Sequence, residues 1–87
     1  MTGKYPIFDD HEWDNLACTI PLSRRQRDIS HCLFRGFRDR QIAEELGLSI
    51  STIRTHLSML FEKTGTQDRV DYILFLLQHF LNNFRQT

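Results

Sequence analysis

Long apolar runs are missing from this chain of 87 residues. No segment approaches the roughly 20 consecutive apolar residues that a membrane-spanning helix needs, and the N-terminal MTGKYPIFDD lacks the charged and apolar regions of a signal peptide. Internal repeats, low-complexity tracts and long linkers are also absent. We therefore expect a cytoplasmic protein without a membrane partner, and the length allows a single domain with one modest core.

Catalytic and metal-binding motifs are equally scarce. The two cysteines, Cys18 and Cys32, have no metal-ligand spacing and no disulfide framework, so we expect both to be small core residues that stay reduced. The four histidines are scattered, with no HExxH or CxxC motif, and the Ser-rich stretch 49–52 has no glycine-flanked nucleophile elbow. The sequence predicts no enzyme, no metal site and no cofactor.

A net charge is absent too, because 11 Lys and Arg residues balance 11 Asp and Glu residues. The charges are unevenly distributed: residues 1–21 carry one lysine against four acidic residues, whereas residues 22–63 carry eight basic residues against five acidic ones. Contacts with phosphates usually leave a basic imprint on a protein. The small basic excess therefore agrees with a nucleic-acid binder of modest affinity and little nonspecific binding.

Helical periodicity, by contrast, is present in five segments, and we predict an all-α fold. The first helix starts with the pair Asp9 and Glu12, and proline 21 ends that segment. Short polar residues precede the later helices, where a side-chain oxygen can cap the first backbone amides. The expected helices run from about Asp9 to Cys18, from Ser23 to near Gly36, and from caps at Asp39, Ser49 and Asp68.

Residues 39–63 have the layout of a helix-turn-helix. In the first half, Ile42 and Leu46 recur at helical spacing, and Gly47 then supplies the permissive backbone of a tight turn. A second helix starts within three residues, where Ser49 can cap it.

The second helix of this pair has two unlike faces. One is an apolar stripe that should complete the core, and the other carries short polar side chains beside an arginine. Such a face can approach base edges closely. The apolar stripe holds Ile53, Leu57, Leu60 and Phe61, and the opposite face holds Ser51, Thr55 and Ser58, flanked by Arg54 and His56.

From Leu22 to Arg69 the chain resembles the LuxR/GerE family of helix-turn-helix transcription regulators. The blocks that carry the resemblance are LSRRQRDI, Gly36, RQIAEELGLS, TIRTHL and EKTGTQDR, in the order and spacing of the family. TIRTHL followed at the right distance by K-x-G-x-x-x-R is fairly specific. The resemblance implies an N-terminal extension with a short helix over residues 1–21, then a four-helix domain with a C-terminal dimerisation helix over residues 22–87.

The chain also departs from the family pattern. The family usually has Pro and Glu where this chain has Arg24 and Gln26, so a charge pair that the Glu would make inside the domain is called into question. Ser23 and Gln26 still form a capping-box pair. Thr66 stands where an apolar residue is usual, which weakens the expected packing before the last helix.

The resemblance implies that the helix over about residues 50–63 enters the major groove of DNA. Arg54 occupies the position that commonly reaches base edges, and a solvated surface charge is the alternative interpretation. Thr55 and Ser58 occupy the neighbouring groove-facing positions, although their hydroxyls suit water or phosphate equally well. The expected DNA-binding residues are Ser51, Thr52, Arg54, Thr55, His56, Ser58, Lys63 and Arg69.

Four of these residues have phosphate or structural interpretations. Thr52 and His56 resemble phosphate-contacting or cap-supporting residues, and a partly buried structural histidine suits His56 equally well. Lys63 and Arg69 are placed to anchor backbone phosphates, whereas the alternative for Arg69 is an ion pair with Glu62 or another acidic neighbour.

The expected last helix is apolar on two sides. We assign one stripe to the core and a second, water-facing patch to a partner, and the resemblance implies two-fold pairing of last helices in a homodimer. The stripe assigned to the core is Val70, Ile73, Leu77, Phe80, Leu81 and Phe84. The predicted dimer interface is Tyr72, Phe75, Leu76 and His79. The N-terminal extension should pack its own apolar residues on the core: Tyr5, Ile7, Phe8, Trp13 and Leu16.

The expected function is that of a stand-alone, sequence-specific regulator of transcription that binds double-stranded DNA as a homodimer. The alternative is a dimeric adaptor that keeps the fold without binding DNA and docks on a transcription factor or RNA polymerase; near-neutral charge and an apolar last helix suit it. Region 4 of a sigma factor also contains a helix-turn-helix, but the TIRTHL and K-x-G blocks fit it less well.

Overall fold

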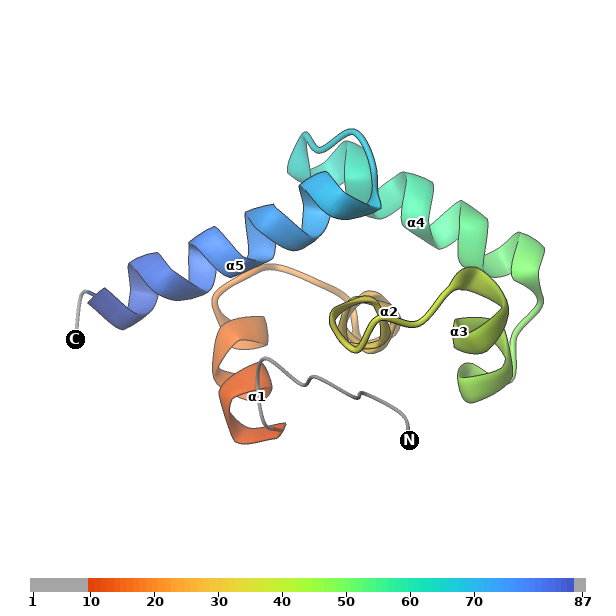
Figure 1. The fold of residues 1–87 in the computed structure, drawn as a ribbon, viewed down its shortest axis with the longest axis horizontal. Helices are drawn as coiled ribbons and strands as arrows, with labels where there is room; N and C mark the ends of the chain where they lie inside the picture. The colour runs from red at the N-terminus through yellow and green to blue at the C-terminus, as the bar shows by residue number, and fades with distance from the viewer. Residues whose placement is uncertain (1–9, 86–87) are drawn as a thin grey trace.

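The computed structural model describes residues 10–85, and within this range the chain forms five α-helices and no strand. The helices are α1 (Asp10–Cys18), α2 (Arg24–Phe34), α3 (Asp39–Leu46), α4 (Ile50–Thr64) and α5 (Arg69–Arg85). Figure 1 looks down α2, which lies at the centre, with α3 to its right, α1 below and to its left, and α4 and α5 above. The predicted all-α architecture is confirmed. Predictions for Asp9, Tyr5, Ile7 and Phe8 lie outside the described residues.

Local side-chain contacts define most helix starts. Ser23 Oγ accepts a hydrogen bond from the Gln26 amide at 3.1 Å, and Gln26 Oε1 accepts one from the Ser23 amide at 2.9 Å, so the predicted capping box is confirmed. Ser49 and Asp68 cap α4 and α5 as predicted, since each accepts a hydrogen bond from the amide three residues later. Gly47 closes α3 in the left-handed conformation, with φ 69°.

The predicted cap of α3 was wrong. Arg38 precedes the helix, and its amide donates to Gln41 Oε1 at 2.9 Å, while Asp39 is already the first helical residue. The glutamine satisfies an amide at the helix start that has no partner within the helix. The Asp39 carboxylate is instead directed at two arginines from other helices, which the local pattern does not reveal.

The core lies where α2 meets α3, α4 and α5. Ile53, Leu57 and Leu60 of α4 are buried and Phe61 is half-buried, which confirms the predicted apolar stripe. Cys32 is also in the core as predicted, and burial, together with the nearby Glu45 carboxylate, raises the pKa of its thiol to about 11. The Leu16, Cys18 and Phe84 side chains lie outside the described ones.

The assignment of the faces of α5 was wrong in part, although Ile73, Leu77 and Phe80 pack against the core as predicted. Tyr72 and Leu76, which we predicted at a dimer interface, are fully buried within the chain, whereas Val70 and Leu81 are 63% and 39% exposed. The Tyr72 hydroxyl lies 2.6 Å from Ser30 Oγ in α2, and its ring packs against Phe61 of α4. The Tyr72 side of α5 therefore packs against α2 and α4, and Val70 and Leu81 lie on the outward side.

Phe75 and His79 lie at the edge of this aromatic face and are half-buried. The Phe75 ring stacks between Tyr72 and His79, with centroid distances of 6.3 and 6.2 Å. A ring nitrogen of His79 is 2.9 Å from the Thr19 hydroxyl, after α1. Both residues therefore support packing inside one chain, and they do not form the separate outward patch that we predicted.

Helix α1 is attached to α2 through aromatic stacking. Trp13 is only 5% exposed, and its ring lies 5.0 Å from His31 in a stacked arrangement and 5.8 Å from Phe34. The prediction that Trp13 packs on the core is confirmed.

Candidate nucleic-acid interface

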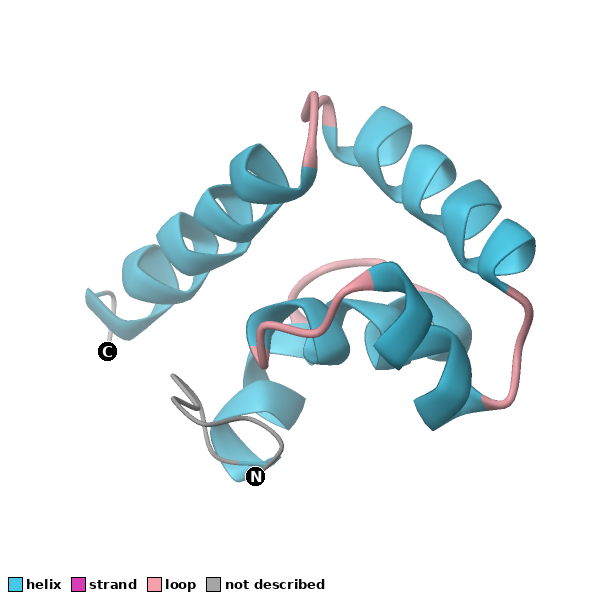
Figure 2. Ribbon diagram, turned by 45° about the vertical axis from the view of Figure 1, so that its right-hand side comes forward, coloured by secondary structure: helices cyan, strands magenta, loops and turns pink. Residues whose placement is uncertain are grey.

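One side of α4 is exposed along the whole helix. Figure 2 shows that only short connections join α3 to α4 and α4 to α5, so α4 is held at both ends while its outer side stays open. The exposed positions are spaced by three or four residues, which places them on one face. They are Ser51, Arg54, Thr55, Ser58, Met59, Glu62 and Lys63.

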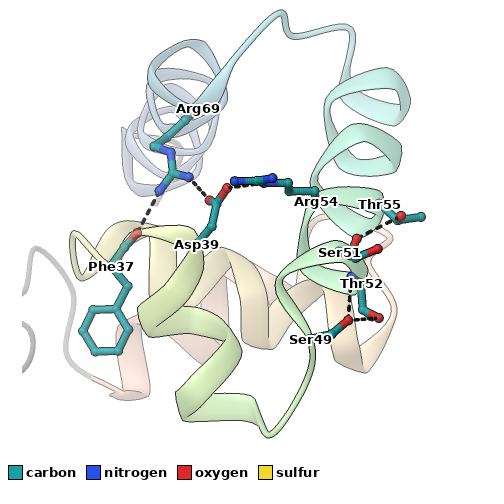
Figure 3. Close-up of polar contacts among 8 residues, drawn as sticks. All are labelled: Phe37, Asp39, Ser49, Ser51, Thr52, Arg54, Thr55 and Arg69. Atoms are coloured by element: carbon teal, nitrogen blue, oxygen red, sulfur yellow. Dashed lines mark hydrogen bonds and ion pairs between the residues drawn. The ribbon is translucent and has the colours of Figure 1, made fainter.

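The first turn of α4 is fixed by hydroxyl groups (Figure 3). Ser49 Oγ accepts from the Thr52 amide at 3.1 Å and donates to Thr52 Oγ1 at 2.9 Å. One turn on, Thr55 Oγ1 donates to the Ser51 carbonyl at 3.1 Å. That bond uses the only hydroxyl proton of Thr55, so the side chain presents an acceptor oxygen and its methyl group to a ligand. A threonine methyl can contact the methyl group of thymine.

Asp39 links the exposed arginine of α4 to the start of α5. Its Oδ2 lies 3.4 Å from Arg54 Nε, and its Oδ1 is paired with Arg69 Nη2. Arg69 also donates from Nη1 to the Phe37 carbonyl at 2.8 Å. Figure 3 shows the carboxylate of Asp39 between the two guanidinium groups, with Thr55 pointing away from it.

The two arginines of this cluster differ in exposure. The Arg69 side chain is 34% exposed and the Arg54 side chain 71% exposed. Arg69 is thus held inside the domain by Asp39. This agrees with the alternative prediction for Arg69, an ion pair with an acidic neighbour. Arg54 makes a single, mostly solvated contact of a kind that contributes only about 0–1 kcal/mol. A stronger ligand, such as a guanine edge, can therefore replace or share that contact.

Lys63 and His56 lie at the borders of the exposed face. Lys63 Nζ is 3.4 Å from Gln26 Oε1, a neutral acceptor at the position where the family usually has Glu. His56 is half-buried, and its Nδ1 is buried with no hydrogen-bond partner among the described residues. Contacts of these two residues with phosphate stay predictions.

We did not predict two residues of the candidate site from the sequence. Met59 is 50% exposed beside Ser58 on the outer face of α4, and its spacing of four residues from Thr55 was a sufficient signal. Asp39 was assigned to a helix cap. Nothing in its local pattern points to Arg54 or Arg69, because these lie 15 and 30 residues further along the chain.

Residues 10–85 hold no candidate metal site and no candidate membrane span among the described side chains and helices. Within this range no three His, Cys, Asp or Glu side chains are grouped so that they could hold a metal ion. None of the helices described here is both long and apolar enough to cross a membrane.

Comparison with known proteins agrees with the helix-turn-helix geometry. The family GerE, described as bacterial regulatory proteins of the luxR family, matches residues 20–76. The HTH-type transcriptional regulator MalT of Klebsiella pneumoniae subsp. pneumoniae is 34% identical over 67 residues, 77% of this chain and 7% of that protein. MalT of Cronobacter sakazakii is 34% identical over 79 residues, 80% of this chain and 9% of that protein. The chain thus spans less than a tenth of the length of these relatives. No solved structure matches it.

Proposed function

Since the chain belongs to the LuxR family of bacterial regulatory proteins, we propose that it regulates transcription by binding double-stranded DNA, with α4 in the major groove. The observation that carries this proposal is the continuous exposed face of α4. A helix in the major groove contacts base edges with a few outward side chains while the rest of the domain supports it. The hydroxyl contacts and the exposed guanidinium of this face match that requirement.

In this proposal the residues of the face have separate roles. Arg54 contacts a guanine edge, because its guanidinium can donate two parallel hydrogen bonds to O6 and N7. Thr55 and Ser58 contact neighbouring bases, and Met59 adds apolar contact. Lys63, at the exposed end of α4, contributes charge toward backbone phosphates and no preference among sequences.

We further propose that two copies pair through the exposed side of α5. At about 100° per residue, the outward apolar residues of α5 fall within roughly 60° of one another. Exposed contiguous apolar side chains are typical of an interface, and a two-fold pair would present two α4 helices to half-sites about 10 base pairs apart. This stripe replaces the interface that we predicted from the sequence. Its exposed residues are Val70, Leu74 and Leu81, and the half-buried Leu77, which also packs on the core, lies beside them.

Selection of bound sequences from random DNA tests the proposal. We expect an enriched, near-palindromic motif, and Arg54→Ala should cost about 1–3 kcal/mol of discrimination at one position of each half-site. Lys63→Ala should weaken binding to every sequence alike and lower the salt slope by about 1. If no motif is enriched at low salt, DNA recognition is excluded and the dimeric adaptor is the better account.

A further inference from the structure

Asp39 is placed to control the arginine that we assign to base recognition. It lies at the first position of α3, and it contacts the side chain of Arg54 from α4 and that of Arg69 from α5. We infer that Asp39 is a specificity-determining residue that positions Arg54 for the DNA, an inference that rests on the proposed function of α4.

The carboxylate is itself held in place. Arg69 contacts Asp39 Oδ1 with one amino group and the Phe37 carbonyl with the other, at 2.8 Å. The Asp39 side chain is only 24% exposed. A carboxylate fixed in this way at the junction of three helices offers Arg54 a contact point of defined position.

The geometry of the Arg54 contact leaves the guanidinium able to bind a base. Asp39 Oδ2 lies near Nε of Arg54, at 3.4 Å. A guanidinium has five N–H donors, and the four on the two terminal amino groups are separate from Nε. Two parallel donors suffice for guanine. The Asp39 contact therefore restricts the rotamers of a long, exposed side chain without occupying the donors that guanine requires, which reduces the entropy lost on binding.

Asp39 should also weaken the binding of DNA in which Arg54 contacts no base. A negative charge beside the expected interface repels backbone phosphates, which supply most of the affinity for nonspecific DNA. When Arg54 binds a guanine, the attraction of that contact offsets the repulsion. Asp39 should thus lower nonspecific affinity more than specific affinity, and so increase the ratio between the two.

The test is a double-mutant cycle between Asp39→Asn and Arg54→Ala, read out as the ratio of affinities for the selected site and for random DNA at fixed salt. Asn retains an oxygen that can accept from Arg69, and thermal unfolding checks that the fold is kept. We expect Asp39→Asn to raise affinity for random DNA and to lower the ratio by about fivefold. In the Arg54→Ala background the same change should leave the ratio unaltered.

Two further variants separate the effect of the position of the Asp39 carboxylate from the effect of its charge. Glu44→Gln removes one negative charge from an exposed position of the same helix, and it should leave the ratio unchanged. Asp39→Glu keeps the charge and displaces the carboxylate by one methylene, so it should lower the ratio without raising affinity for random DNA. This variant also replaces Asp39→Asn in the cycle if the latter fails to fold.

The outcomes are distinct. If Asp39→Asn lowers the ratio equally with and without Arg54, or if Glu44→Gln has the same effect, Asp39 does not act through Arg54 and the inference is wrong. If the unaltered protein has no preferred site, the proposed function fails first and the inference falls with it.

Discussion

At the scale of single residues, the contact between Ser30 and Tyr72 joins α2 to α5 through one buried polar pair. Ser30 Oγ donates to the Gln26 carbonyl at 2.7 Å, so its only proton is used and the Tyr72 hydroxyl must donate to Ser30 at 2.6 Å. Both residues are fully buried. Burial raises the pKa of the Tyr72 phenol more than the hydrogen bond lowers it. The phenol is therefore neutral near pH 7, with its proton available for this bond.

Tyr72→Phe should lower the free energy of unfolding by about 1 kcal/mol, because the buried oxygen of Ser30 loses its donor. For a domain of this size that corresponds to a fall of about 4–8 °C in Tm. Circular dichroism during thermal unfolding measures it. Adding Ser30→Ala to Tyr72→Phe should cost less than the sum of the single changes. A Tyr72→Phe protein as stable as the unaltered one would show that the bond contributes nothing.

At the scale of secondary structure, α5 has apolar residues on a buried side and on an exposed side. The face with Tyr72 and Leu76 is fully buried against the rest of the chain, whereas Val70 and Leu74 on the other side are 63% and 56% exposed. Among the side chains that the structure describes, Met59 of α4 is the other large apolar one that is at least half exposed. The outward face of α5 is thus the main apolar surface left for a partner.

Leu74→Asp should give a folded monomer, because the charge enters the proposed interface and no core contact is lost. Sedimentation equilibrium of both proteins at high micromolar concentration measures the change. Leu76→Asp is the matched control on the opposite face: it buries an unpaired carboxylate and should prevent folding. A monomeric unaltered protein at that concentration would contradict pairing through α5.

At the scale of the whole molecule, α1 precedes residues 20–76, which match the family, and extends the core. A domain of this length buries a small core, so its free energy of unfolding is small. Trp13 enlarges the core by covering Phe34 and stacking on His31. Trp13 of α1 therefore covers part of α2 with a residue of the same chain.

Trp13→Ala should lower the free energy of unfolding by about 3–5 kcal/mol, the usual cost of deleting a buried tryptophan. Urea unfolding followed by circular dichroism is the suitable measurement, because the variant loses the fluorescent probe. Asn15→Ala alters an exposed residue of the same helix and should change the stability by less than about 0.5 kcal/mol. Equal effects of the two changes would mean that α1 is not part of the cooperative core.

The sequence by itself determined the features that depend on neighbours within four or five residues. The capping pair Ser23 and Gln26, the caps of α4 and α5, and the turn at Gly47 all formed as predicted. The two faces of α4 were also predictable, since one is apolar and the other polar, and only one orientation buries the apolar side.

Only the tertiary structure decided which face of α5 is buried and what Asp39 contacts. Both sides of α5 are apolar, so periodicity alone fits either orientation. In the folded chain the buried side includes Tyr72, whose hydroxyl contacts Ser30, 42 residues away. Asp39 is a normal helix-start residue in its local sequence, and its carboxylate meets Arg54 and Arg69 only once three helices have packed. Contacts between residues far apart in sequence leave no periodic trace in a single chain. These contacts determine which side of α5 is exposed and where the charges lie at the candidate DNA interface.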